Sequence, residues 1–132
     1  MSSKHILYGD AKSTAREGDS QRKQRGLSAA EQNYTTDPSA ANRMILATAL
    51  FDMGKFSEAE QHMTTLLETN KDNPDMLFEL GFIYKNLGRK DEAIAIWKQL
   101  VAAAPRHPLA KGAENEIWRL DQTYKPSWLR AE

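Results

Sequence analysis

The sequence predicts an all-α protein built from antiparallel pairs of helices. Apolar residues recur at steps of three and four along most of the chain after residue 28, which places them on one face of a helix. An asparagine, aspartate or histidine precedes proline at Asp37-Pro38, Asn73-Pro74 and His107-Pro108, and this pair is typical of helix starts. Glycine or proline then ends each apolar stripe. Together these signals predict a series of helices of about four turns each.

Residues 1–27 differ from the rest of the chain. Between Gly9 and Gly26 there is no valine, isoleucine, leucine, methionine or aromatic residue. Such a segment cannot bury enough apolar surface to offset the entropy lost on ordering. We therefore expect a flexible or extended N-terminal arm over residues 1–27. Three apolar residues near its start could dock on a partner or on the chain's own body: Ile6, Leu7 and Tyr8.

A short helix is expected where the helical domain begins, and we predict that domain over residues 28–122. Ser28 and Glu31 have the spacing of a capping box, in which two side chains satisfy free N–H groups at the first turn of a helix. The helix is expected to start at Ser28 and to run through Tyr34.

Two helix pairs are expected next. The first occupies about residues 38–70 and is divided at Gly54, and the second occupies about residues 74–104 and is divided at Gly88. Because the link within each pair is so short, the two helices must fold back as an antiparallel hairpin. The apolar stripes of the second pair consist of Leu77, Leu80, Ile83, Tyr84, Leu87, Ala93, Ile94, Ile96, Trp97, Leu100 and Val101.

Gly81 lies in the middle of a predicted helix, where glycine costs about 1 kcal/mol relative to alanine. The simplest compensation is a close approach of two helix backbones. Gly81 and Ala93 are the small residues that would permit it, with Tyr84 and Trp97 filling the space beside them.

A last helix is expected over about residues 108–122, started by His107-Pro108. One face is apolar and the other is expected to point to solvent through Lys111, Glu114, Glu116 and Arg119. A stack of helix pairs needs such a capping helix, because an uncapped end exposes core.

The C-terminal tail, residues 123–132, is more apolar than expected for a terminus that makes no contacts. It contains Tyr124, Trp128 and Leu129, and Pro126 prevents simple continuation of the preceding helix. These side chains either fold back over the last helix or are offered to another chain, and we favour fold-back.

The second helix pair resembles the tetratricopeptide repeat, a helix-turn-helix unit of 34 residues. The residues that carry the resemblance are Leu77, Leu80, Gly81, Tyr84, Gly88, Ala93, Trp97, Leu100 and Pro105. The same spacing of 34 relates Gly54 to Gly88, Ala59 to Ala93, Leu46 to Leu80 and Leu66 to Leu100. The preceding segment is a weaker copy, which departs from the pattern at Ala47, Leu50, Met63 and Lys71. The resemblance implies a short superhelix of two repeats, over about residues 40–73 and 74–107, plus the capping helix.

The resemblance also implies a binding face, because the first helix of each pair lines the concave side of such a stack. By matching to the family pattern, the residues on this side are Met44, Thr48, Phe51, Asp52, Asp75, Phe78, Phe82, Lys85 and Asn86. We call these nine residues the groove floor. Four of the nine are large and apolar, which suits an amphipathic helix laid in a groove better than a charged C-terminal peptide. Alternatively, the chain covers the floor with its own 28–35 helix or its tail.

The sequence gives no support for catalysis. It has no cysteine, and His5, His62 and His107 have no spacing that would chelate a metal. No glycine-rich phosphate loop and no serine in a nucleophile elbow is present. We therefore expect no enzyme activity, no metal and no cofactor.

Charge and composition favour protein partners. The 18 basic residues equal the 18 acidic ones, so no electrostatic partner is implied. The apolar run near the N-terminus is too short for a signal peptide or a membrane span, so we expect a cytoplasmic protein without membrane insertion. Two repeats fall below the three usually needed for a free-standing stack, so flanking helices or a partner must complete it.

We therefore expect a non-catalytic module that binds proteins, as an adaptor, an assembly factor or a small subunit of a larger complex or homo-oligomer. The alternative is a nucleic-acid-associated accessory protein that uses the basic residues of the arm: Lys12, Arg16, Arg22, Lys23 and Arg25. We favour nucleic acid less, because acidic residues dilute this charge and no aromatic residues are interleaved with it.

Overall fold

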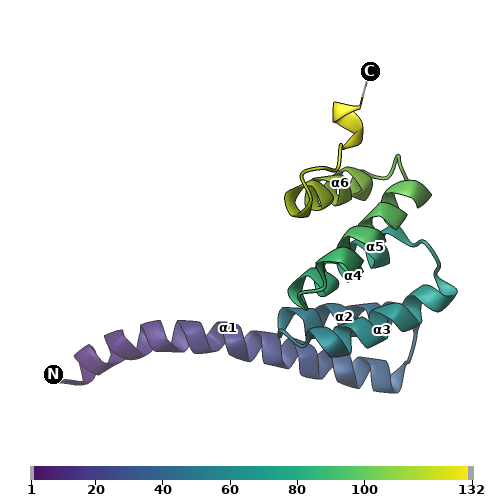
Figure 1. Ribbon diagram of the computed structural model, residues 1–132. Coiled ribbons are helices and arrows are strands. Elements are labelled where there is room, and N and C mark those ends of the chain that lie inside the picture. The colour runs from purple at the N-terminus through teal and green to yellow at the C-terminus, as the bar shows by residue number, and fades with distance from the viewer. Residues whose placement is uncertain (1, 131–132) are drawn as a thin grey trace.

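The computed structural model describes the backbone of residues 2–130 and the side chains of residues 18–130. Within that range the secondary structure is helical, as the sequence predicted (Figure 1). The elements are α1 (Ser2–Thr36), α2 (Ala40–Asp52), α3 (Phe56–Thr69), α4 (Pro74–Asn86), α5 (Lys90–Ala103), α6 (Pro108–Leu120) and the 3-10 turn η1 (Ser127–Leu129).

Helix α1 corrects the expectation of a flexible or extended backbone over residues 1–27. Residues 2–27 are helical and continue without a break into the helix expected from Ser28, so the capping box there starts no helix. Once a helix nucleus exists, each further residue adds a backbone hydrogen bond without apolar contacts. Alanine, lysine, arginine, glutamine and glutamate, which are frequent in this segment, favour helix, although Gly9, Gly18 and Gly26 oppose it. Leu27 and Ala30 provide the anchored end, since both are buried against the body of the protein. Residues 19–26 are exposed, and α1 runs on beyond the other helices.

Local capping interactions fix where α2, α4 and α6 begin. Asn73 caps α4 by accepting a hydrogen bond from the Met76 N–H at 3.1 Å, and His107 caps α6 through Nδ1, as their positions before proline predicted. Helix α2 begins later than expected. Ser39, not Asp37, is its cap, because the Ser39 Oγ accepts from the Asn42 N–H at 3.1 Å.

Glycines end the first helix of each pair. Gly54 and Gly88 both have φ of +77°, a left-handed conformation that residues with a Cβ rarely adopt. Each lies between two helices that fold back on each other, α2 on α3 and α4 on α5.

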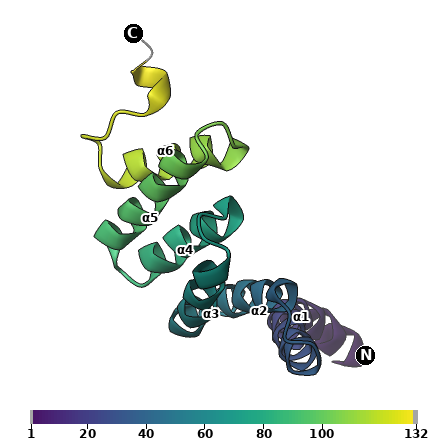
Figure 2. The same ribbon diagram turned by 90° about the vertical axis from the view of Figure 1, so that its right-hand side faces the viewer.

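The helices form a stack in chain order, with each helix packed on the next and α4 also touching α6 (Figures 1 and 2). One buried cluster joins α1 to α2, α3 and α4, and includes Leu27, Leu50 and Met63. A second cluster joins α4, α5 and α6 around Trp97. Helix α1 therefore closes one end of the stack, and α6 with the tail closes the other.

The indole of Trp97 occupies the space above Gly81. A Cβ at residue 81 would lie 2.0 Å from the Trp97 Nε1, and the three nearest atoms all belong to that ring. The indole N–H donates a hydrogen bond to the Phe78 carbonyl at 3.0 Å. This corrects the expected role of Gly81, since its missing side chain makes room for Trp97 itself. Ala93 is fully buried in the same cluster.

Candidate functional site

The groove floor lies on the first helices of the two pairs, α2 and α4, and its apolar members are only partly covered. Met44, Phe51, Phe78 and Phe82 are half-buried, as is Thr48. The polar members are exposed on the helix ends: Asp52, Asp75, Lys85 and Asn86.

Phe78 and Phe82 form the apolar centre of the floor. Their rings meet edge to face at a centroid distance of 5.0 Å, and Phe82 packs in the same way on Trp97 at 5.1 Å. Such aromatic pairs are rigid and add about 0.5–1.5 kcal/mol beyond their burial. The Lys85 ammonium lies 5.9 Å from the centre of the Phe82 ring. The structure thus brings Phe78, Phe82 and Lys85 together on α4.

The α2 members are less closely grouped. Phe51 meets Phe56 of α3 edge to face at 5.3 Å, within its own helix pair. Thr48 links α2 to α4 by donating a hydrogen bond to the Glu79 Oε2 at 3.2 Å. Burial raises the pKa of Glu79, and the hydrogen bond from Thr48 opposes this shift. Glu79 therefore lies at the contact between α2 and α4.

Helix α6 also contacts the groove floor, although none of the nine predicted residues lies on α6. The repeat offset of 34 makes Gly112 the equivalent of Phe78 and Glu116 the equivalent of Phe82, so these residues are expected on neighbouring first helices of the stack. The structure agrees, since a Cβ on Gly112 would lie 3.4 Å from the Phe78 ring. Lys85 and Glu116 form an ion pair at 3.7 Å. The sequence could have predicted this contact of α6, because the helix start His107-Pro108 follows the helix start Asn73-Pro74 by the same 34 residues.

The end of α1 covers the α2–α3 pair at the N-terminal end of the stack. Tyr34 meets His62 of α3 edge to face at 5.8 Å, and the Arg43 guanidinium lies 4.9 Å from the centre of the Tyr34 ring and donates to its hydroxyl. The side chains of Ile6, Leu7 and Tyr8 lie outside the described residues.

The tail folds over α6 and is held there by Glu114. This carboxylate accepts hydrogen bonds from the Tyr124 hydroxyl at 2.9 Å, from the Ser127 N–H and Oγ at 2.7 Å each, and from Arg130 at 3.3 Å. Pro126 is buried, whereas Trp128 and Leu129 remain 41% and 57% exposed. Among the described residues, no hydrogen bond, ion pair or aromatic contact joins the tail or α1 to the groove floor, although Met44 and Phe51 pack against the buried cluster that includes Leu27 and Ala30 of α1.

Glu114 corrects the expectation that it points to solvent, since it is only 3% exposed. The repeat offset explains its position, because Leu46, Leu80 and Glu114 are spaced 34 apart and Leu46 and Leu80 are buried core residues. Where the first two helix pairs place a leucine in the buried core, α6 places a carboxylate against the tail. Burial opposes ionisation of Glu114, but the donors from Ser127, Tyr124 and Arg130 hold its pKa below the ordinary value.

Acidification is expected to release the tail. Because the pKa of Glu114 is lower in the folded protein, its contribution to stability is present above the ordinary value of 4.5 and is lost as the pH falls through the folded-state pKa. The Ser127 amide resonance in NMR spectra should titrate with a midpoint below 4.5, and Glu114→Gln should remove this titration. A midpoint above 4.5 would contradict the arrangement.

The described residues offer little for metal binding or membrane insertion. No three histidine, aspartate or glutamate side chains among them come close enough to hold a metal ion. His62 is a single half-buried histidine beside Tyr34, and burial followed by the charge of Arg43 lowers its pKa. None of the helices over residues 2–130 combines the length and apolar character that crossing a bilayer requires.

A family model described as tetratricopeptide repeat matches residues 28–117, from the last turns of α1 through most of α6. No curated protein matches the chain.

Proposed function

Because the chain belongs to the tetratricopeptide repeat family, whose repeats generally mediate binding between proteins, we propose that it is a non-catalytic module that binds a partner segment across α2, α4 and α6. The family is a non-enzymatic repeat module. The observation that carries the proposal is the half-exposed Phe78–Phe82 pair at the centre of the groove floor.

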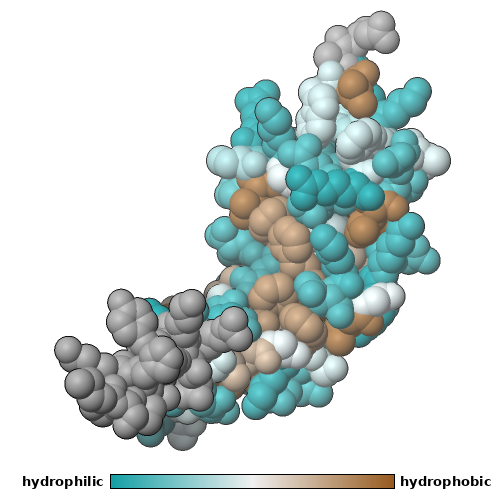
Figure 3. Space-filling model, turned by 90° about the vertical axis from the view of Figure 1, so that its left-hand side faces the viewer, coloured by the Kyte–Doolittle hydropathy of each residue, from teal (hydrophilic) through white to brown (hydrophobic). Residues whose placement is uncertain are grey.

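An amphipathic helix is the partner segment that fits this surface best. Phe78 and Phe82 offer an apolar centre, and the Phe78 ring lies directly beside Gly112 of α6. Lys85 and Asn86 offer polar groups at the edge. Helix-in-groove recognition uses this combination of apolar anchors and a polar rim. Figure 3 shows apolar surface as a broken band along one face of the molecule, bordered by hydrophilic side chains.

The roles open to such a module are those of an adaptor, an assembly factor or a small subunit of a complex. Two repeats alone are marginal as a stack. Here α1 and α6 add buried residues at both ends, among them Leu27, Ala30, Ala113 and Ile117. This favours a stack that holds its own shape and leaves the floor for a partner.

The nucleic-acid alternative has weaker support. Arg22, Lys23 and Arg25 are exposed on α1, but Arg22 pairs with Asp19 at 2.8 Å. Among the described residues of this segment no aromatic side chain accompanies the cations, and base stacking is what single-stranded nucleic acids add to phosphate contacts.

Phe78→Glu is expected to abolish partner binding while the protein stays helical. The new charge would lie in the apolar centre of the floor, and loss of an aromatic anchor at an interface commonly costs about 2 kcal/mol or more. Affinity purification from the source cells with wild-type protein and with the variant, followed by mass spectrometry, gives the comparison. Proteins retained by the wild type should fall at least tenfold with the variant.

Ala95→Glu is the matched control, since Ala95 is an exposed apolar residue of α5, the second helix of the same pair, and is not part of the floor. It should keep the same partners. If Phe78→Glu retains every protein that the wild type binds, or loses its helical circular dichroism signal, the floor is not the binding face.

A further inference from the structure

The C-terminal end of the stack carries an incomplete helix pair. The offset of 34 places Trp118 of α6 at the position of Leu50 and Tyr84, which pack in the two helix pairs. Leu50 is 2% exposed, whereas Trp118 is 42% exposed. No second helix follows α6 in the described residues, and the tail covers the vacant side only in part.

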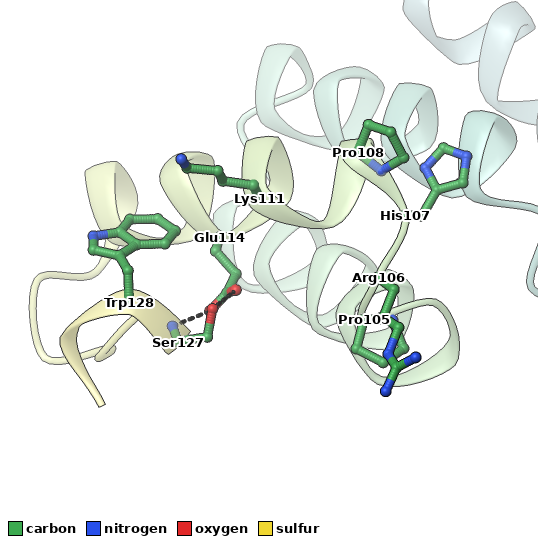
Figure 4. A pocket seen from close by; sticks show the side chains of 8 residues that line it. All are labelled: Pro105, Arg106, His107, Pro108, Lys111, Glu114, Ser127 and Trp128. Carbon is green, nitrogen blue, oxygen red and sulfur yellow. Dashed lines mark hydrogen bonds between the residues drawn. The ribbon is translucent and has the colours of Figure 1, made fainter. Parts of the chain in front are cut away.

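Two adjoining clefts lie on either side of Trp128. One, of about 290 Å³, is bounded largely by apolar side chains, with Trp118, Pro126 and Leu129 joining Trp128 and Asn115. The other, of about 570 Å³, lies between the α5–α6 loop, α6 and the tail (Figure 4). The residues lining it that bear on its chemistry are Arg106, Lys111, Glu114 and Trp128.

The larger cleft is electropositive. Arg106 and Lys111 line it and form no ion pair with any residue in the described part of the chain. The Lys111 ammonium lies 5.9 Å from the centre of the Trp128 ring, which keeps the cation beside the indole. The one carboxylate in the lining, Glu114, is buried and already accepts four hydrogen bonds from the tail. Its charge is therefore largely compensated, and the cleft presents mainly cations.

We propose that this end of the molecule is a second docking surface, which binds an acidic amphipathic segment of another protein. The segment would lie beside α6 and the tail, with apolar side chains against Trp118, Trp128 and Leu129 and carboxylates toward Arg106 and Lys111. Charge complementarity selects an acidic segment over a basic one. The polar outer residues of α1, such as Glu31, Gln32 and Asn33, make a second copy of this chain a poor match.

The test uses the full chain and a fluorescein-labelled synthetic peptide with leucine and phenylalanine at helical spacing and glutamate elsewhere. Its counterparts are the same peptide with lysine for each glutamate and a single-stranded oligothymidylate. Binding is followed by fluorescence anisotropy. The glutamate peptide should bind, and its Kd should rise at least tenfold in Trp128→Ala and in Lys111→Glu. Both residues are exposed, so both variants should fold.

Lys23→Glu, an exposed cation of α1, is the matched charge control and should leave the Kd unchanged. Equal binding of the lysine peptide, tighter binding of the oligothymidylate, or an unchanged Kd in both end variants would overturn the inference. Binding lost in Phe78→Glu but kept in Lys111→Glu would place the peptide on the groove floor. That outcome overturns this second surface and leaves the proposed function standing.

Discussion

Trp97→Ala is expected to lower the free energy of unfolding by about 3–5 kcal/mol, the usual loss for a buried aromatic residue truncated to alanine. Trp97 is fully buried, packs on Phe82 and sits in the cluster that joins α4, α5 and α6. The variant also removes the only side-chain donor that the structure records for the Phe78 carbonyl. Urea unfolding followed by far-ultraviolet circular dichroism measures the loss.

Trp118→Ala is the matched control, because it removes the same side chain from a site that is 42% exposed. Its cost should be about 1 kcal/mol or less, as for most substitutions at exposed sites. Equal losses in the two variants would show that Trp97 does not hold the α4–α5 pair together.

Gly81→Ala is expected to destabilise the protein by about 2–3 kcal/mol, although alanine is the better helix former by about 1 kcal/mol. The added Cβ would lie within 2.0–2.6 Å of three atoms of the Trp97 ring, so the ring must move. Overpacking of this kind costs about 1–3 kcal/mol, and a displaced indole also leaves its N–H without a partner. The same unfolding experiment measures the change.

Two further variants isolate the cause. Gly112→Ala, whose Cβ would make only ordinary contact with Phe78 at 3.4 Å, should be neutral or stabilising by up to about 1 kcal/mol. In a Trp97→Ala background, Gly81→Ala should also stabilise the protein, because the indole with which the added Cβ clashes is absent. If Gly81→Ala destabilises both backgrounds equally, the clash with Trp97 is not the reason for glycine at this position.

The sequence predicted the elements whose signals are local. The starts of α4 and α6 follow from an N-cap residue before proline, and the breaks at Gly54 and Gly88 follow from glycine's access to positive φ. The family and the helical stack follow from the 34-residue spacing. Whether the groove floor binds a partner stays a prediction.

The sequence did not predict features that depend on which residues a side chain contacts in the folded protein. Glu114 matches a solvent-facing position by its chemistry, and only its equivalence to Leu46 and Leu80 reveals that it is buried. The part of α1 before Ser28 was missed, because a lack of apolar side chains argues against burial and not against helix. For Gly81, the sequence identified the small residue and Trp97 near it, but it predicted a close approach of two helix backbones where the indole itself fills the space.

The buried carboxylate of Glu114 limits how this array could be lengthened by protein engineering. A consensus helix fused after α6 would displace Tyr124, Ser127 and Arg130 and remove the donors of that carboxylate. An ionised carboxylate that is buried between two helices without hydrogen-bond donors is strongly destabilising. A longer array would therefore need leucine in place of Glu114 before it could accept another repeat.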